Sequence, residues 1–180
     1  MGRRLFAAVL LPPCTAEQLA AYAATAAPHA RRPPTESLHV TVHFLGQVGA
    51  PVDELADALA DVCAPLPRFD MRVAAGAWAP RRRPRMLWAA LEPHPGFVRA
   101  AEQVASALSG LAPAARPPRT ARPHVTLARL REDPTPHAPP PLELDDPVIA
   151  VDAIALMESR LSPRGSTYAA LSSAPLLGRT

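Results

Sequence analysis

Short apolar runs and segments with helical spacing alternate along the chain. The first run, LFAAVLL at residues 5–11, predicts a buried strand, and the alternating pattern of 38–45 predicts a strand with one buried face. By the same criteria, strands are predicted at 5–11, 38–45, 69–78, 85–91, 124–130, 148–157 and 167–171. Apolar residues spaced three and four apart predict helices over 15–27, 51–63 and 97–111.

These elements predict a single α+β domain. The strands outnumber the helices, and the regular strand–helix–strand order of a parallel sheet is absent, so we expect antiparallel pairing. At 180 residues the chain has the length of one domain, or of two small lobes that share a core.

The composition is that of a globular protein. Apolar residues make up 48% and charged residues 19%, and no segment approaches the roughly 18 uninterrupted apolar residues of a membrane-spanning helix. The first apolar run is short and lacks a cleavage pattern, so we predict no signal peptide and no membrane partner. Cys14 and Cys63 match no metal or redox spacing, which indicates free thiols in a reducing compartment. We therefore expect a cytoplasmic protein.

All basic residues are arginines. There are 19 of them against 16 acidic residues, which gives a formal net charge of +3. A guanidinium presents a planar fork of donors that matches phosphate, so such a surface suits anionic ligands. A charge of this size does not by itself predict nucleic-acid binding.

One tetrapeptide occurs twice. HVTV at 39–42 recurs as HVTL at 124–127, and each copy lies in a predicted strand. Because side chains alternate across a strand, the histidine and threonine of each copy share one face, and the two apolar residues share the other. Two such strands together would bring two imidazoles and two hydroxyls into one site. The candidate residues are His39, Thr41, His124 and Thr126.

These groups suit the cleavage of a phosphodiester. An imidazole, with its ordinary pKa of about 6.5, can give or take a proton at neutral pH, so two of them can act as general acid and general base. The hydroxyls can donate to phosphate oxygens whose charge grows in the transition state. No metal is needed for such a reaction. A single histidine on a strand is more often structural, but two copies with matching flanks favour a shared site.

Five segments carry a resemblance to a known family, in family order along nearly the whole chain. They are RLFAAV at 4–9 with Pro12, LHVTVHFLG at 38–46, RPRMLW at 83–88, RPHVTLAR at 122–129 and ESRLSP at 158–163. The paired H-x-T-x motifs resemble those of the 2H phosphoesterase superfamily. The wider context is similar to its RNA 2′,3′-cyclic phosphodiesterase branch, also called the 2′-5′ RNA ligase family.

The resemblance implies a two-lobed fold over residues 1–180, with antiparallel sheets backed by helices around a central cleft. It implies hydrolysis of a terminal 2′,3′-cyclic phosphate to a 2′-phosphate, without metal or cofactor, and reversible 2′-5′ ligation. His39 would be the proton donor and His124 the proton acceptor, while Thr41 and Thr126 would hold the phosphate.

Several other residues are candidates for contacts with RNA. By strand alternation His43 shares the face of the first motif, where it would contact phosphate or lie at the cleft rim, whereas Phe44 would lie in the core. Arg85 and Arg129 lie in family-like segments, and their alternative role is solubilising charge. Trp78 and Trp88 could stack on a base, although strand tryptophans more often belong to the core. A metal site built on His39 and His43 lacks a third ligand.

Two other functions remain open. One is a phosphodiesterase for a small nucleotide such as an ADP-ribose cyclic phosphate, and the other is a non-catalytic RNA-binding module with the same fold. Partners are therefore RNA ends or small cyclic nucleotides, and we expect a monomer.

Overall fold

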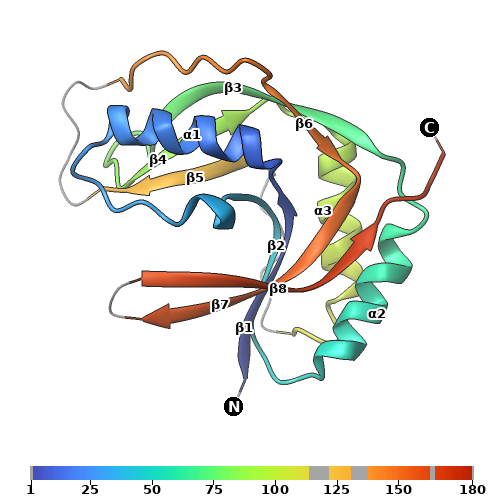
Figure 1. Ribbon diagram of the computed structural model, residues 1–180. Helices are drawn as coiled ribbons and strands as arrows, with labels where there is room; N and C mark the ends of the chain where they lie inside the picture. Colours follow the sequence, from blue (N-terminus) through green and yellow to red (C-terminus); the bar gives the residue numbers. More distant parts are fainter. Residues whose placement is uncertain (1, 114–121, 131–137, 163–164, 180) are drawn as a thin grey trace.

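The computed structural model describes residues 2–113, 122–130, 138–162 and 165–179, and these segments contain eight strands and three α-helices (Figure 1). In chain order the elements are β1 (Arg3–Leu10), α1 (Pro13–Ala26), the 3-10 helix η1 (Thr35–Ser37), β2 (His39–Val48), α2 (Val52–Cys63), β3 (Phe69–Ala79), β4 (Met86–Leu91), α3 (Pro95–Ala107), β5 (His124–Arg129), β6 (Val148–Val151), β7 (Ala153–Ser162) and β8 (Gly165–Pro175). Among the described helices, none combines the length and the apolar character needed to cross a membrane.

The strands form one curled antiparallel sheet with the order β6-β3-β4-β5-β2-β1-β7-β8 (Figure 1). Its two four-stranded halves meet where β2 pairs with β5, at Val40 and Val125. These two valines are the second residues of the two tetrapeptides, so the halves join at the repeated motif. The predicted α+β class with antiparallel strands is confirmed.

Helices cover one face of the sheet in each half. Helix α1 contacts β5, whereas α2 and α3 contact each other and pack against β7, β8 and β2 (Figure 1). Helix α1 begins at Pro13, two residues before the predicted start, because a proline at the first helical position lacks only an N–H that would have no partner there. The main core fills the space between helices and sheet.

Strand β1 is buried on both faces, which is why it appears in the sequence as an uninterrupted apolar run. Its odd-numbered residues Leu5, Ala7 and Val9 belong to the main core. Phe6 and Ala8 belong to a second, smaller apolar cluster together with Ala155 and Met157, against which Tyr168 packs. This second cluster lies on the same face of the sheet as the candidate site residues.

The predicted strand over 148–157 is divided at Asp152. Strand β6 pairs with β3 at one edge of the sheet, and β7 pairs with β1 in the other half. The positions that belong to the main core change parity across the break, from Ile149 and Val151 to Ile154 and Leu156, whereas Ala155 and Met157 belong to the second cluster. A single straight strand would place only one of the two pairs in the main core, so the chain crosses between the two halves at this point.

Candidate active site

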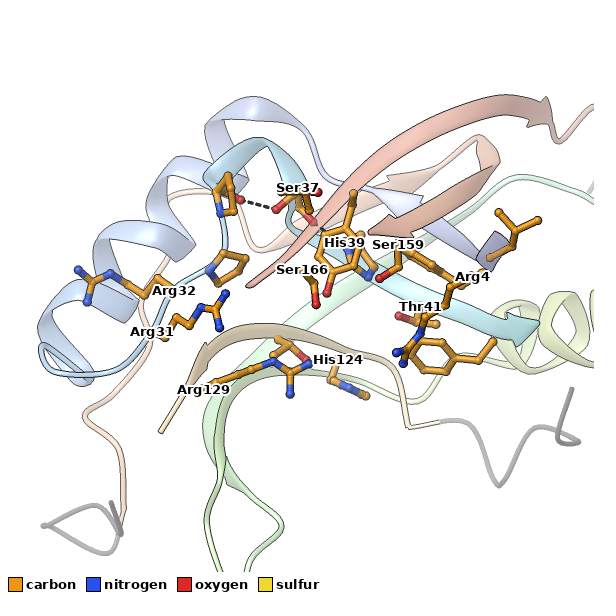
Figure 2. Close-up of a pocket in the computed structure, with 18 of the residues that line it drawn as sticks. Arg4, Arg31, Arg32, Ser37, His39, Thr41, His124, Arg129, Ser159 and Ser166 are labelled. Atoms are coloured by element: carbon orange, nitrogen blue, oxygen red, sulfur yellow. Dashed lines mark hydrogen bonds between the residues drawn. The ribbon is translucent and has the colours of Figure 1, made fainter. Parts of the chain in front are cut away.

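A cleft of about 810 Å³ lies on the open face of the sheet where the two halves meet (Figure 2). Its walls come from β1, β2, β5, the β7–β8 hairpin and the loop that precedes η1. All four residues of the repeated motif that were predicted to form a site line it: His39, Thr41, His124 and Thr126.

The two motifs are related by a local two-fold arrangement. They run antiparallel and pair at Val40 and Val125, whose side chains are completely buried. Continuing this register by one residue in each direction places His39 opposite Thr126 and Thr41 opposite His124. Each imidazole is thus beside the hydroxyl of the other motif, and all four groups face the same cleft.

Both imidazoles are held in the same way by a backbone carbonyl two residues earlier. The Nδ1 atom of His39 lies 2.7 Å from the carbonyl oxygen of Ser37, and Nδ1 of His124 lies 2.9 Å from that of Arg122. A carbonyl can only accept a hydrogen bond, so Nδ1 carries the proton in both rings. Nε2 is therefore the atom of each ring that is left to exchange a proton with a substrate.

Aromatic side chains fix the planes of both imidazoles. The indole of Trp88 is stacked on His124, with ring centroids 3.7 Å apart and an interplanar angle of 19°. The ring of His39 packs against Phe6 at 4.8 Å and Tyr168 at 5.1 Å, the latter edge-on. Both histidines are thus preorganised by their supporting strands, which lowers the cost of orienting them in a reaction.

Burial shifts both histidines in the same direction. It lowers the pKa of His124 below 6.5, against the opposing effect of the hydrogen bond to Arg122. It also lowers the pKa of His39, where the bond to Ser37 opposes the shift and the positive charge of a protonated His124 adds to it. The free protein therefore holds both imidazoles mainly neutral above pH 6.5.

The prediction for His43 is wrong because β2 contains a bulge. Ala8 pairs with Thr41 and Ala7 with His43, so Val42 has no partner on β1 and the alternation of side chains reverses. His43 is turned into the protein and is only 4% exposed. Phe44, assigned to the core by alternation, is instead 61% exposed and lines the cleft.

The second motif contains the same bulge. Trp88 pairs with Thr126 and Leu87 with Ala128, which leaves Leu127 without a partner on β4. Ala128 is therefore buried, and Arg129, a candidate for contacts with RNA, lines the cleft. Arg129 and Phe44 occupy equivalent positions in the two halves, one cationic and the other aromatic.

The other residues predicted to contact RNA do not all lie at the site. Arg85 does not line the cleft and lies on the turn between β3 and β4. Trp78 belongs to the main core, whereas Trp88 supports His124. Within the segments that the structure describes, no group of three or more histidine, cysteine or carboxylate side chains could hold a metal ion.

The structure adds cleft residues that the sequence analysis missed. Three further arginines line the cleft, and Figure 2 shows Arg4 near Ser159 and Thr41, with Arg31 and Arg32 at the opposite end. The β7–β8 hairpin contributes uncharged polar side chains: Ser159, Ser166, Thr167 and Tyr168. The pair Arg31-Arg32 is visible in the sequence, but only the fold brings it beside Arg129.

Comparison with known proteins agrees with this architecture. Residues 11–162 match the profile of the 2′-5′ RNA ligase superfamily. The chain belongs to this superfamily. An RNA 2′,3′-cyclic phosphodiesterase of Thermus thermophilus is 34% identical to it over 157 residues, which cover 81% of this chain and 75% of that protein. Both the family and the fold class predicted from the sequence are thereby confirmed.

Two solved structures are similar to this superfamily member over almost their whole length. TT0787 of Thermus thermophilus superposes with a TM-score of 0.83 at 29% identity and covers 98% of this chain and 100% of its own. Escherichia coli LigT complexed with 3′-AMP superposes with a TM-score of 0.78 at 27% identity, covering 98% and 99%.

The position of His43 yields a first prediction. Because its ring is buried behind the bulge and not in the cleft, His43→Ala should lower the free energy of unfolding by about 1–3 kcal/mol and leave catalysis of the folded protein within about twofold. Urea denaturation and kcat measured on the folded fraction check the two effects. A large loss of kcat at unchanged stability would restore a role for His43 in the cleft.

Proposed function

We propose that this protein is an RNA 2′,3′-cyclic phosphodiesterase that hydrolyses a terminal 2′,3′-cyclic phosphate to a 2′-phosphate. The observation that carries the proposal is the pair of antiparallel H-x-T motifs, whose imidazoles and hydroxyls line one cleft. The 34% identical relative bears the same activity in its name, and the LigT complex shows that a structurally similar protein accepts a nucleotide with a 3′-phosphate.

In the proposed reaction each histidine exchanges a proton with one of two oxygens: the oxygen of the attacking water, or the ribose O3′ that leaves phosphorus. His124 Nε2 takes a proton from a water whose oxygen attacks phosphorus. The bond between phosphorus and O3′ breaks, and His39 Nε2 gives its proton to O3′, which leaves a 3′-hydroxyl and a 2′-phosphate. Nδ1 of each ring stays bonded to its carbonyl throughout, so each ring uses a single nitrogen for the transfer.

The other cleft residues act on charge rather than on protons. The hydroxyls of Thr41 and Thr126 can donate to the two non-bridging oxygens, which gain charge in the transition state. The positive charge of the nearby arginines stabilises the bound anionic substrate. The bound phosphate also favours the protonated form of His39, which offsets the burial that lowers its pKa in the free protein. Ligation through a 2′-5′ linkage is the same displacement with the 5′-hydroxyl of a second RNA in place of water, and O3′ leaves in both reactions.

The experiment that tests this function uses an oligonucleotide ending in a 2′,3′-cyclic phosphate, incubated with the protein in the presence of chelator. We expect a product with a 2′-phosphate, which chromatography against 2′- and 3′-phosphate standards identifies. Exclusive formation of a 3′-phosphate would contradict the assignment of the departing oxygen. Binding of the oligonucleotide without turnover would instead favour the non-catalytic RNA-binding module.

The pKa shifts predict the pH dependence of kcat/KM, which reports the free protein. The rate is lost at low pH when His124 is protonated and at high pH when His39 is deprotonated. Because burial lowers the pKa of both groups, both limbs move to lower pH, and we expect a bell with its maximum below pH 6.5. A maximum well above that value would contradict either the two roles or the burial of the rings.

The fluorescence of Trp88 provides a second measurement of the lowered pKa of His124. Its indole is stacked on His124, and an imidazolium in contact with an indole quenches its fluorescence. The chain has two tryptophans, so Trp78→Phe leaves Trp88 as the only emitter. Its fluorescence should fall on acidification with a midpoint below 6.5, and the titration should vanish in His124→Gln.

The proposal includes a protein that acts as a single two-lobed domain, as a monomer and in the cytoplasm. In its support, both cysteines are free, as in a reducing compartment.

A further inference from the structure

The two halves of the sheet place different side chains beneath their motif histidines. At the bulge in each half, Thr41 of β2 pairs with Ala8 of β1, and Thr126 of β5 pairs with Trp88 of β4. Ala8 and Trp88 are therefore equivalent positions, one occupied by a methyl group and the other by an indole. The indole is stacked on His124, with ring centroids 3.7 Å apart and planes inclined by 19°.

The ring of His39 has a different aromatic environment. It lies 4.8 Å from the ring of Phe6 at an angle of 37°, and 5.1 Å from that of Tyr168 at 75°. Neither contact is a parallel stack, and neither ring attracts a cation as strongly as an indole does. The hydrogen bond from Nδ1 to a carbonyl is common to both histidines. The stack on Trp88 is therefore a feature that distinguishes His124 from His39.

A protonated His124 has no carboxylate to pair with in the described part of the cleft. The titratable groups that share the cleft with it are His39 and Tyr168. Strand β4, which lies beside it, has the uncharged sequence MLWAAL. The charged side chains that line the cleft are all cationic: Arg4, Arg31, Arg32 and Arg129. Among the described groups in contact with His124, those that favour its positive charge are the carbonyl oxygen of Arg122 and the face of the indole.

The surroundings of Trp88 indicate that its ring, and not its N–H group, is what this position uses. Nε1 is buried and has no hydrogen-bond partner among the described residues. A buried donor without a partner costs free energy, which leucine or phenylalanine at this position would avoid. Trp88 is also absent from the described residues that line the cleft, so it contacts the imidazole from outside the space for the substrate.

We propose that Trp88 is a positioning residue that makes His124 the stronger base of the pair by stabilising its protonated form. The inference rests on the proposed function, in which His124 takes a proton from water and becomes an imidazolium. A cation over the face of an indole is attracted by the ring quadrupole, more strongly where water is excluded. The neutral imidazole gains less from the same stack, so the contact favours the transition state, in which positive charge develops on the ring. His39, with Ala8 at the equivalent position, lacks this contribution.

The test follows the titration of His124 by NMR, in protein labelled at Cε1 of its six histidines. The signal that is absent from His124→Gln belongs to His124. Trp88→Leu keeps an apolar cover over the ring but removes the indole face, so the midpoint should fall by about one pH unit, a tenfold change in the equilibrium. In Trp88→Phe the midpoint should fall less. Trp78→Phe, the matched control in the main core, should leave it unchanged.

Fluorinated tryptophan separates the electrostatics of the indole from its packing. The chain has two tryptophans, so 5-fluorotryptophan supplied to Trp78→Phe during expression enters position 88 alone. Fluorine draws charge away from the face of the ring while the shape changes little, so the attraction for a cation weakens. The midpoint of His124 should fall from tryptophan to 5-fluorotryptophan, and further with a more highly fluorinated indole. This series gives an answer even where Trp88→Leu folds poorly.

Kinetics on the cyclic-phosphate oligonucleotide connect the titration to the reaction. In Trp88→Leu the acidic limb of kcat/KM should move to lower pH together with the midpoint, and the maximal rate should fall by about three- to tenfold because the base is weaker. A rate that falls while the midpoint stays in place would overturn the inference, since Trp88 would then act through packing alone.

The outcomes separate this inference from the proposed function. A midpoint that stays or rises in Trp88→Leu and across the fluorinated series would overturn the role of Trp88 and leave the function intact. An unmodified protein that hydrolyses no cyclic phosphate would contradict the function, whereas the titration of His124 would still report whether the indole stabilises its charge.

Discussion

Replacing His124 by alanine should lower kcat on a cyclic-phosphate oligonucleotide by about a hundred- to ten-thousand-fold, and replacing His39 should cost a similar factor. Each imidazole presents a single available nitrogen to the cleft, because its other nitrogen is bonded to a carbonyl. His43 cannot stand in for either one, since it is turned into the protein. In the proposed mechanism, loss of either ring therefore removes one of the two proton transfers.

The residual activity of the two variants distinguishes their roles. Without His124, the proposed base, the acidic limb of the pH profile of kcat/KM should disappear. Without His39, the proposed acid, the alkaline limb should disappear instead. The measurement is a pair of pH profiles taken on protein whose folding is verified by circular dichroism, because both rings also pack against aromatic side chains.

His29→Ala is the matched control, since His29 is an exposed histidine outside the cleft and its loss should change neither limb. Profiles that lose the opposite limbs would mean that acid and base are exchanged. A wild-type rate in either variant would end the two-histidine mechanism.

Much of this site could be predicted from the sequence because the repeated tetrapeptide couples chemistry to strand geometry. Alternation places a histidine and a threonine on one face, and their apolar neighbours anchor the strand in the core. Val40 and Val125 do more than anchor, because they are the pair through which the two halves of the sheet join. The pairing partner of a strand is set by the whole fold, so this contact was not visible in either copy alone.

The errors at His43 and Phe44 have one physical cause, the bulge at Val42. A bulge inserts one unpaired residue and reverses the faces that follow, while leaving the local hydrophobicity unchanged. The second copy of the motif did contain a signal of its bulge. Strict alternation would have placed Ala128 in the cleft and Arg129 in the core, and an unpaired arginine in a core is strongly unfavourable. Applied to both copies, that argument would have turned Phe44 toward the substrate.

The contact between Arg31 and Arg129 shows a different limit of prediction from the sequence. Arg31 and Arg129 are 98 positions apart in the sequence, and neither lies in a pattern that predicts the other. Their juxtaposition depends on an isolated bridge between a loop and the end of β5. Sequence periodicity reports what each element buries, whereas contacts between a loop and a strand end depend on tertiary packing.

Thr41→Val and Thr126→Val should each lower kcat by about a hundredfold while changing KM much less. Valine keeps the branched shape that suits a strand, so the protein should fold normally and lose only a hydroxyl donor. Because the donors act on charge that grows in the transition state, their loss affects the chemical step more than ground-state binding. The serine variants, which retain the hydroxyl, should recover most of the rate.

The two-fold arrangement makes this prediction more specific. Thr41 lies opposite His124 and Thr126 opposite His39, so in the proposed site we expect the two hydroxyls to approach the phosphate from opposite sides, each meeting a different non-bridging oxygen. Sulfur at one of these oxygens weakens the hydrogen bond to it, and the two diastereomers of a cyclic phosphorothioate place sulfur at one or the other. Thr41→Val should therefore reduce the rate penalty of one diastereomer, and Thr126→Val that of the other. Equal effects of both variants on the same diastereomer would show that the hydroxyls share one oxygen and would contradict this arrangement.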